Sequence, residues 1–207
     1  MRISHLLFVL AVCLSIVRSN NYDPHVAHTT GPWFEGWYNR IVDAKNGRSM
    51  AVVVASLCTT GKICQQDQNL PGLVSVGVQL NRTGELVFYD EFPEQVSILV
   101  DGKPPLQEPD FSSPPNFTWS SQDNGYFTPT SISLRLSTHD LEITAEFSEP
   151  VFWNPNNPGE GPEGGVMMLP LQQHWFVYSL SSATTYTLRI GDSYYKGTGL
   201  THQEKNW

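Results

Sequence analysis

The chain has 207 residues, of which 40% are hydrophobic and 12% aromatic, so it can enclose a core or a ligand cavity in one domain of ordinary size. A second full domain does not fit. Its 20 acidic residues outnumber 12 basic ones, for a net charge of −8. No basic stripe is present to release counterions, so nucleic acid is excluded as an expected partner.

The first 19 residues read as a secretory signal peptide. Arg2 gives a basic start, residues 6–17 form an apolar run, and residues 17–19 have small side chains at the first and third places. The run is shorter than a membrane span of about 20 residues, and no later stretch approaches that length. We therefore expect a secreted protein whose single domain covers residues 20–207. Loss of Arg2 and Arg18 leaves 10 basic against 20 acidic residues, a charge of −10.

Short alternating runs rich in Val, Ile, Leu, Thr and aromatic residues dominate the rest of the chain, bounded by Gly, Pro, Asn and Asp. This pattern is typical of antiparallel sheet, and no convincing amphipathic helix interrupts it. The predicted strands are residues 34–43, 50–57, 74–80, 86–92, 96–100, 131–137, 141–147, 173–179, 185–190 and 194–204.

Tight turns follow several of these runs, at residues 46–47, 81–84, 101–102 and 138–140. Most lead directly into another run, so neighbouring strands should pair as hairpins. The meander that results closes most naturally into a barrel, because closure removes exposed sheet edges. We predict an all-β antiparallel meander that closes into a β-barrel.

Residues 102–130 and 149–170 are long, irregular and rich in Pro, Gly, Asn and Ser. Loops of this length are usually functional lids or poorly ordered excursions. In the second segment, residues 158–165 contain only Glu, Pro and Gly, which favours a mobile surface loop. Phe152, Trp153 and the apolar residues 166–169 favour a cover over a cavity mouth instead.

The cysteines and two sequons also agree with a secretory route. Cys13 leaves with the signal peptide, and Cys58 and Cys64 should form a disulfide across a hairpin end, with two free thiols as the alternative. No His or second Cys pair lies close by in sequence, so we expect no metal there. Asn81 and Asn116 each begin an Asn-x-Thr acceptor for glycosylation.

Near the N-terminus, a carboxylate lies among bulky aromatic residues on a predicted strand. Alternation places Trp33, Glu35 and Trp37 on one face. If that face points inward, burial raises the pKa of the acid and holds its proton. The structural alternative is that Glu35 bonds to strand backbone or pairs with Arg40, and that the tryptophans are ordinary core.

A similar stretch ends the chain. His202, Glu204 and Asn206 share one face of the last strand, and Lys205 and Trp207 point the other way. A polar triplet would thus enter one side of the strand together, and imidazole can relay a proton near neutral pH. The alternative is a hydrogen-bonded strand end in which Glu204 has no reactive role.

Several of these segments together resemble the tocopherol cyclase family. The resemblance is carried by residues 34–38, 170–171, 174–180, 197–200 and 204–207. It spans most of the chain after about position 30, although only its two ends are specific. The family protonates a prenyl double bond of a prenylated quinol, a phenolic oxygen closes the chromanol ring, and no cofactor takes part.

The resemblance implies a lipocalin-like barrel, because relatives of the family are tandem lipocalin-like barrels. Family members continue beyond the motif at residues 204–207, so the second barrel is expected to be absent or incomplete here. The signal peptide is a further departure, since the plant enzymes act in plastids. Either Glu35 or Glu204 can be the acid that the resemblance implies.

The implied site combines both stretches. Glu35, Glu204 and His202 are the candidate catalytic residues. The candidate substrate-binding residues are Trp33, Trp37, Tyr38, His174, Tyr178, Asn206 and Trp207. A lone histidine or tyrosine on an apolar face is usually a packed core residue, which is the alternative for His174, Tyr38 and Tyr178.

Two functions remain open. The first is acid-catalysed cyclisation of a prenylated quinol, an isomerase reaction without cofactor or metal. The second is a non-enzymatic binder that holds a lipid, quinol or terpenoid pigment in the same barrel. In both, the partner is a hydrophobic small molecule.

Overall fold

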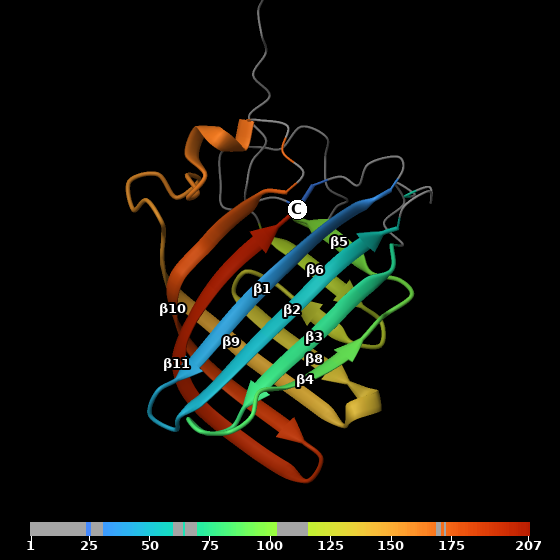
Figure 1. Cartoon of the computed structure of the whole chain (residues 1–207), viewed down its shortest axis with the longest axis vertical. Coiled ribbons are helices and arrows are strands. Elements are labelled where there is room, and N and C mark those ends of the chain that lie inside the picture. Colours follow the sequence, from blue (N-terminus) through green and yellow to red (C-terminus); the bar gives the residue numbers. More distant parts are fainter. Residues whose placement is uncertain are drawn as a thin grey trace, which may run out of the picture.

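The computed structural model describes residues 24–25, 31–59, 64, 70–102, 116–168, 171 and 173–207. The predicted signal peptide lies outside these residues. The fold is all-β (Figure 1). Its strands are β1 (Trp33–Asp43), β2 (Arg48–Cys58), β3 (Gly72–Gln79), β4 (Val87–Glu91), β5 (Ser97–Val100), β6 (Phe117–Ser121), β7 (Gly125–Phe127), β8 (Ser131–Leu136), β9 (Leu141–Val151), β10 (Trp175–Ile190) and β11 (Ser193–Asn206).

All strands belong to one antiparallel sheet in the order β4-β3-β2-β1-β11-β10-β9-β8-β7-β6-β5. The first and last strands therefore lie side by side in its middle, where the blue β1 runs along the red β11 in Figure 1. Hairpins join the strands on either side of this central pair. The predicted antiparallel meander is confirmed.

The predicted closure is wrong, because the sheet curls into an open half-barrel. β4 and β5 are its two edges, and no ladder joins them among the described residues. The chain between these strands turns back onto the start of β3 instead: the Gly72 amide donates to the Pro93 carbonyl (2.9 Å), and the Val96 amide donates to the Leu70 carbonyl (2.8 Å). Pro93 has no amide hydrogen and cannot continue a ladder.

Two short strands lie where the sequence predicted an irregular segment. β6 alternates buried Phe117, Trp119 and Ser121 with half-buried residues, and β7 pairs with it. Conversely, the two strands predicted at residues 173–179 and 185–190 form one long strand, β10. Register shifts around Ser179 and Ser182 mark bulges at which this strand bends.

Helical structure in the described part of the chain is limited to two short 3₁₀ segments, η1 (Ser137–His139) and η2 (Gly164–Met168). No helix described here is long and apolar enough to cross a membrane. The first segment forms the turn between β8 and β9, and the second lies near the C-terminus at one end of the half-barrel (Figure 1).

Alternation along the strands builds a single core on the concave side of the sheet. An aromatic group lies at its centre, where the Trp37 ring is 5.0 Å from Phe117 and 6.4 Å from Phe127, centroid to centroid. The Trp37 Nε1–H donates to the Tyr178 hydroxyl at 3.2 Å. Strands from both halves of the sheet thus meet through these four rings, which we call the aromatic group.

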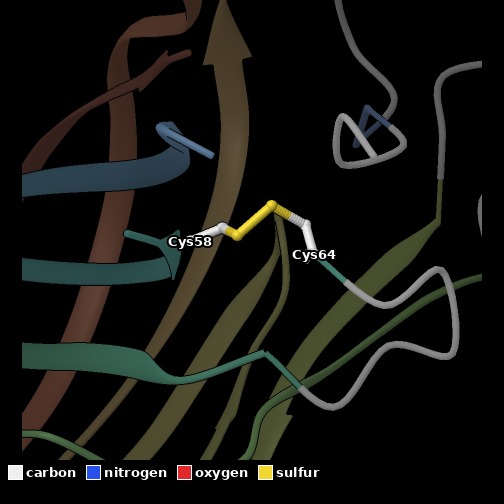
Figure 2. The surroundings of a disulfide bond; sticks show 2 residues. All are labelled: Cys58 and Cys64. Atoms are coloured by element: carbon white, nitrogen blue, oxygen red, sulfur yellow. A yellow bond between two sulfur atoms is a disulfide. The ribbon is translucent and has the colours of Figure 1, made fainter. Parts of the chain in front are cut away.

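The predicted disulfide joins Cys58, the last residue of β2, to Cys64 (Figure 2). Both cysteines are buried. The two cysteines are 6 residues apart in sequence, so the loop that the disulfide closes is small. Asn81 and Asn116, the predicted glycosylation sites, are both exposed; their modification stays a prediction.

Replacing both cysteines with serine should lower the free energy of unfolding by about 2 kcal/mol, the loop-entropy value for so short a loop. Because the bridge lies at the end of β2, the sheet itself should persist. Urea titration followed by circular dichroism measures both quantities. Loss of the native spectrum without denaturant would contradict this expectation.

Candidate functional site

A buried ionic cluster lies at the end of the half-barrel where the chain terminates. Glu35 of β1 and Lys205 of β11 are both fully buried, and the Lys205 Nζ lies 3.1 Å from Glu35 Oε1. His25 completes the cluster: its Nδ1 is 2.7 Å from Oε1, and its backbone amide donates to both carboxylate oxygens at 3.1 and 2.9 Å. We call these three residues the ionic cluster.

The indole ring of Trp207 covers one side of this cluster. The His25 ring stacks on it with centroids 4.6 Å apart, and the Lys205 Nζ lies 4.6 Å from the Trp207 centroid. An ammonium over an indole face is attracted by the ring quadrupole. His174 stacks on Trp207 at 5.6 Å and exchanges two backbone hydrogen bonds with it.

The cluster is held in one charge state by its neighbours. Burial raises the pKa of Glu35, but the Lys205 ammonium and the hydrogen bonds from His25 lower it by more, so the carboxyl has a pKa below its ordinary value. Burial and the nearby Lys205 charge lower the pKa of His25. The expected state near neutral pH is therefore a carboxylate, an ammonium and a neutral imidazole.

A carboxylate from the segment between β9 and β10 binds His174, which stacks on Trp207. Glu163 accepts a hydrogen bond from the Trp175 amide at 3.1 Å, and its Oε2 lies 2.8 Å from Nδ1 of His174. Gly161 is buried nearby, and a Cβ on it would meet the Phe176 ring at 2.7 Å. This part of the predicted irregular segment therefore packs against the strands as a cover.

Several buried polar atoms lack a hydrogen-bond partner among the described residues, including Nε2 of His25 in the ionic cluster. Both amide atoms of Asn39, the Ser56 hydroxyl and the Trp119 indole nitrogen have no hydrogen-bond partner within the described part of the chain. Ser56 is the cross-strand partner of Glu35, and Asn39 is two residues beyond Trp37 on the same face. Unpaired buried groups cost about 1–3 kcal/mol each, so polar atoms of a ligand or water suit them.

The structure places the second predicted acid elsewhere. His202, Glu204 and Asn206 do share one face of β11, but it is the outer face, and Lys205 faces the core. The Glu204 carboxylate lies 3.2 Å from His202 Nε2 and is partly exposed. Tyr38, its cross-strand partner on β1, is also on the outer side. The catalytic and binding roles of these residues stay predictions.

The predicted residues therefore fall into two groups. Glu35, Trp37, His174, Tyr178 and Trp207 lie around the inner site, and Trp33 packs partly against the core. Alternation predicts that Trp207 turns away from His202 and Glu204. Trp207 lies on the same side of β11 as Lys205, whose Nζ is over its ring.

Three residues of the site carried no predicted role. Lys205 was recognised only as part of a motif and placed opposite the acids, and His25 lies in irregular chain 10 residues before Glu35. Glu163 lies in a segment without periodicity. Of these three residues, only Lys205 could be found from the sequence pattern, since alternation places it on the same face as Trp207. Arg40, the alternative partner for Glu35, lies on the outer face of β1.

Comparisons with known proteins leave the family open. No protein-family model and no curated protein matches this sequence. A solved structure from Nitrosomonas europaea, provisionally identified as AttH, is similar at 10% identity and a TM-score of 0.43. The match covers 84% of this chain and 51% of that one, so this chain spans about half its length.

The ion pair predicts a specific pattern of stability. Lys205→Met should lower the free energy of unfolding by about 3–5 kcal/mol, because it leaves the Glu35 carboxylate buried without its cation. The double variant Glu35→Gln/Lys205→Met should lose clearly less, since no buried charge remains. Urea titrations of the two single variants and the double variant form the required cycle. Additive losses would contradict a direct pair.

Stability should also fall as the pH is lowered. Below the ordinary His25 pKa of 6.5 the unfolded chain takes up a proton that the folded chain resists. Glu35 likewise has a lowered pKa, so its stabilisation is present above the ordinary value of 4.5 and disappears as the pH falls through the folded value. Unfolding titrations across this window measure the slope. His25→Gln should flatten its upper part, and an unchanged slope would contradict the assignment.

Proposed function

We propose that this protein binds a small, mainly apolar molecule with an oxygen-bearing head, such as a lipid, a prenylated quinol or a terpenoid pigment. The observation that carries the proposal is the ionic cluster under the Trp207 ring, in which Glu35 and Lys205 are fully buried, next to unpaired inner polar atoms. A lipocalin-like binder of this kind would hold its ligand on the concave side of the sheet.

The chemistry of the inner surface suits such a ligand. The ionic cluster offers a carboxylate and an ammonium for the oxygen-bearing head, and the aromatic group offers flat apolar surface for the body. Replacing a buried ion pair by apolar residues is often neutral or stabilising, so stability alone is a weak reason for this pair. Titratable groups with perturbed pKa values concentrate at functional sites, which supports a role in binding.

Binding is better supported than acid catalysis by Glu35. Protonating an alkene requires a carboxyl that keeps its proton, whereas the pKa of Glu35 is lowered by Lys205 and His25. Cyclisation of a prenylated quinol remains a prediction from the sequence motifs. In that case Glu204, with His202 beside it, becomes the alternative acid on the outer face.

We also propose that the chain is secreted. A disulfide forms and persists in oxidising compartments, so the bridge between Cys58 and Cys64 supports this route. The exposure of Asn81 and Asn116 is compatible with glycosylation along it.

Secreted full-length protein, incubated with a panel of prenylated quinols, fatty acids and terpenoids, should retain at least one of them in native mass spectrometry. Lys205→Met should weaken retention about tenfold or more, because the head group loses the ammonium. Lys196→Met is the matched control, since Lys196 is an exposed lysine of the same strand.

Failure to retain any member of the panel would contradict binding. Organic extracts from the same incubations also report on catalysis. A product of unchanged mass but altered retention time would establish cyclisation, and Glu35→Gln and Glu204→Gln would then assign the acid.

A further inference from the structure

We propose that Lys205 forms a Schiff base with an aldehyde or ketone on an apolar ligand, with Glu35 as its counter-ion. This inference rests on the proposed binding function and names the ligand class more closely, as a carbonyl-bearing lipid or terpenoid. It gives the protein covalent but reversible capture, which ionic anchoring alone does not provide.

The identity and burial of the cation support this role. Lysine is almost never fully buried unless paired, and Lys205 has no exposed surface. For a purely structural pair, arginine would bind the carboxylate through two hydrogen bonds and keep its charge. Lysine is the cation that can give up a proton in a buried site and then act as a nucleophilic amine.

The groups around Nζ match the needs of the reaction. Nζ lies 3.1 Å from Glu35 Oε1, so a carboxylate oxygen is within reach of an ammonium proton, and His25 Nδ1 lies 3.4 Å from Nζ. The pKa of His25 is lowered by burial and by the Lys205 charge, so the Glu35 carboxylate is the proton acceptor. The Glu35 carboxyl can return the proton when water must leave.

The step balances without a further reagent. Lys205 passes one proton to Glu35, and the freed amine attacks the carbonyl carbon to give a carbinolamine. The carbinolamine hydroxyl then leaves as water, taking up the transferred proton, and a protonated C=N bond forms. Ammonium plus carbonyl thus gives iminium plus water, with no oxidant or reductant. The positive charge beside Glu35 is unchanged, so no unpaired buried charge is created.

The sheet register supplies apolar walls for the rest of such a ligand. Lys205 is the cross-strand partner of Trp37 on one side and of Phe176 on the other, and all three side chains are fully buried. Tyr178 follows on β10, with its ring 5.4 Å from that of Phe176. The Lys205 side chain therefore leaves its strand between two aromatic residues, and its Nζ lies over the ring of a third, Trp207.

Reductive trapping tests the proposal directly. Full-length protein would be incubated separately with decanal and with all-trans-retinal, reduced with cyanoborohydride, digested and mapped by mass spectrometry. We expect the adduct at Lys205, at least tenfold above that at the exposed lysines Lys45 and Lys196. This comparison uses the unsubstituted protein and so does not depend on how a variant folds.

Two variants test the separate roles of Lys205 and Glu35. Lys205→Arg keeps a cation for Glu35 but has no nucleophilic amine, so it should lose the adduct while keeping the native circular dichroism spectrum. With retinal, a protonated Schiff base gives a red-shifted absorption band. Glu35→Gln removes its counter-ion and should shift that band to the blue at neutral pH, whereas a lysine labelled by chance elsewhere would not respond.

The outcomes separate the two proposals. Retention of either probe without an adduct at Lys205 would overturn the Schiff base and leave binding intact. An adduct spread equally over Lys45, Lys196 and Lys205 would also overturn it, as would one that survives Lys205→Arg. Retention of neither probe, nor of any compound in the binding panel, would overturn both.

Discussion

The pairing of β1 with β11 is the interaction on which the candidate site depends. It joins the first and last strands in the middle of the sheet, from Gly36 opposite Asn206 to Val42 opposite Leu200. This register places Lys205 next to Trp37 and brings its ammonium to Glu35. A slip of one residue would turn Lys205 outward and Glu204 inward, because side chains alternate strictly along a strand. The register therefore determines whether the ion pair can form, and the ion pair in turn favours this register.

The sequence predicts this arrangement better for β1 than for β11. Alternation alone put Glu35 and Trp37 on one face of β1, since the pattern of that strand is internally consistent. For β11 alternation gave the correct grouping but not the side that faces the core. That side is set by pairing with β1, a contact about 170 residues away in sequence, which periodicity does not contain. His25 and Glu163 lie in irregular chain and had no pattern to reveal them.

The fold, too, follows in part from local sequence and in part from contacts between distant segments. Hairpin turns and long alternating strands follow from local sequence, and the meander is correct for that reason. Closure depends instead on whether the two edge strands meet. Here the chain around Pro93 binds the start of β3, so β4 and β5 do not form a ladder. The short strands β6 and β7 depend on their neighbours for stability, and their three to five residues gave too little alternation to recognise.

A continuous set of contacts connects the cover to the buried charges. Glu163 contacts His174, His174 stacks on Trp207, and Trp207 lies against both His25 and Lys205. Moving the cover would expose the outer face of this ring stack first and admit water toward the ion pair next. Water weakens the attraction between Glu35 and Lys205 but also solvates both ions, so the two effects oppose each other. The packing of Gly161 on Phe176 and the bonds of the Glu163 carboxylate hold the cover against this end of the sheet.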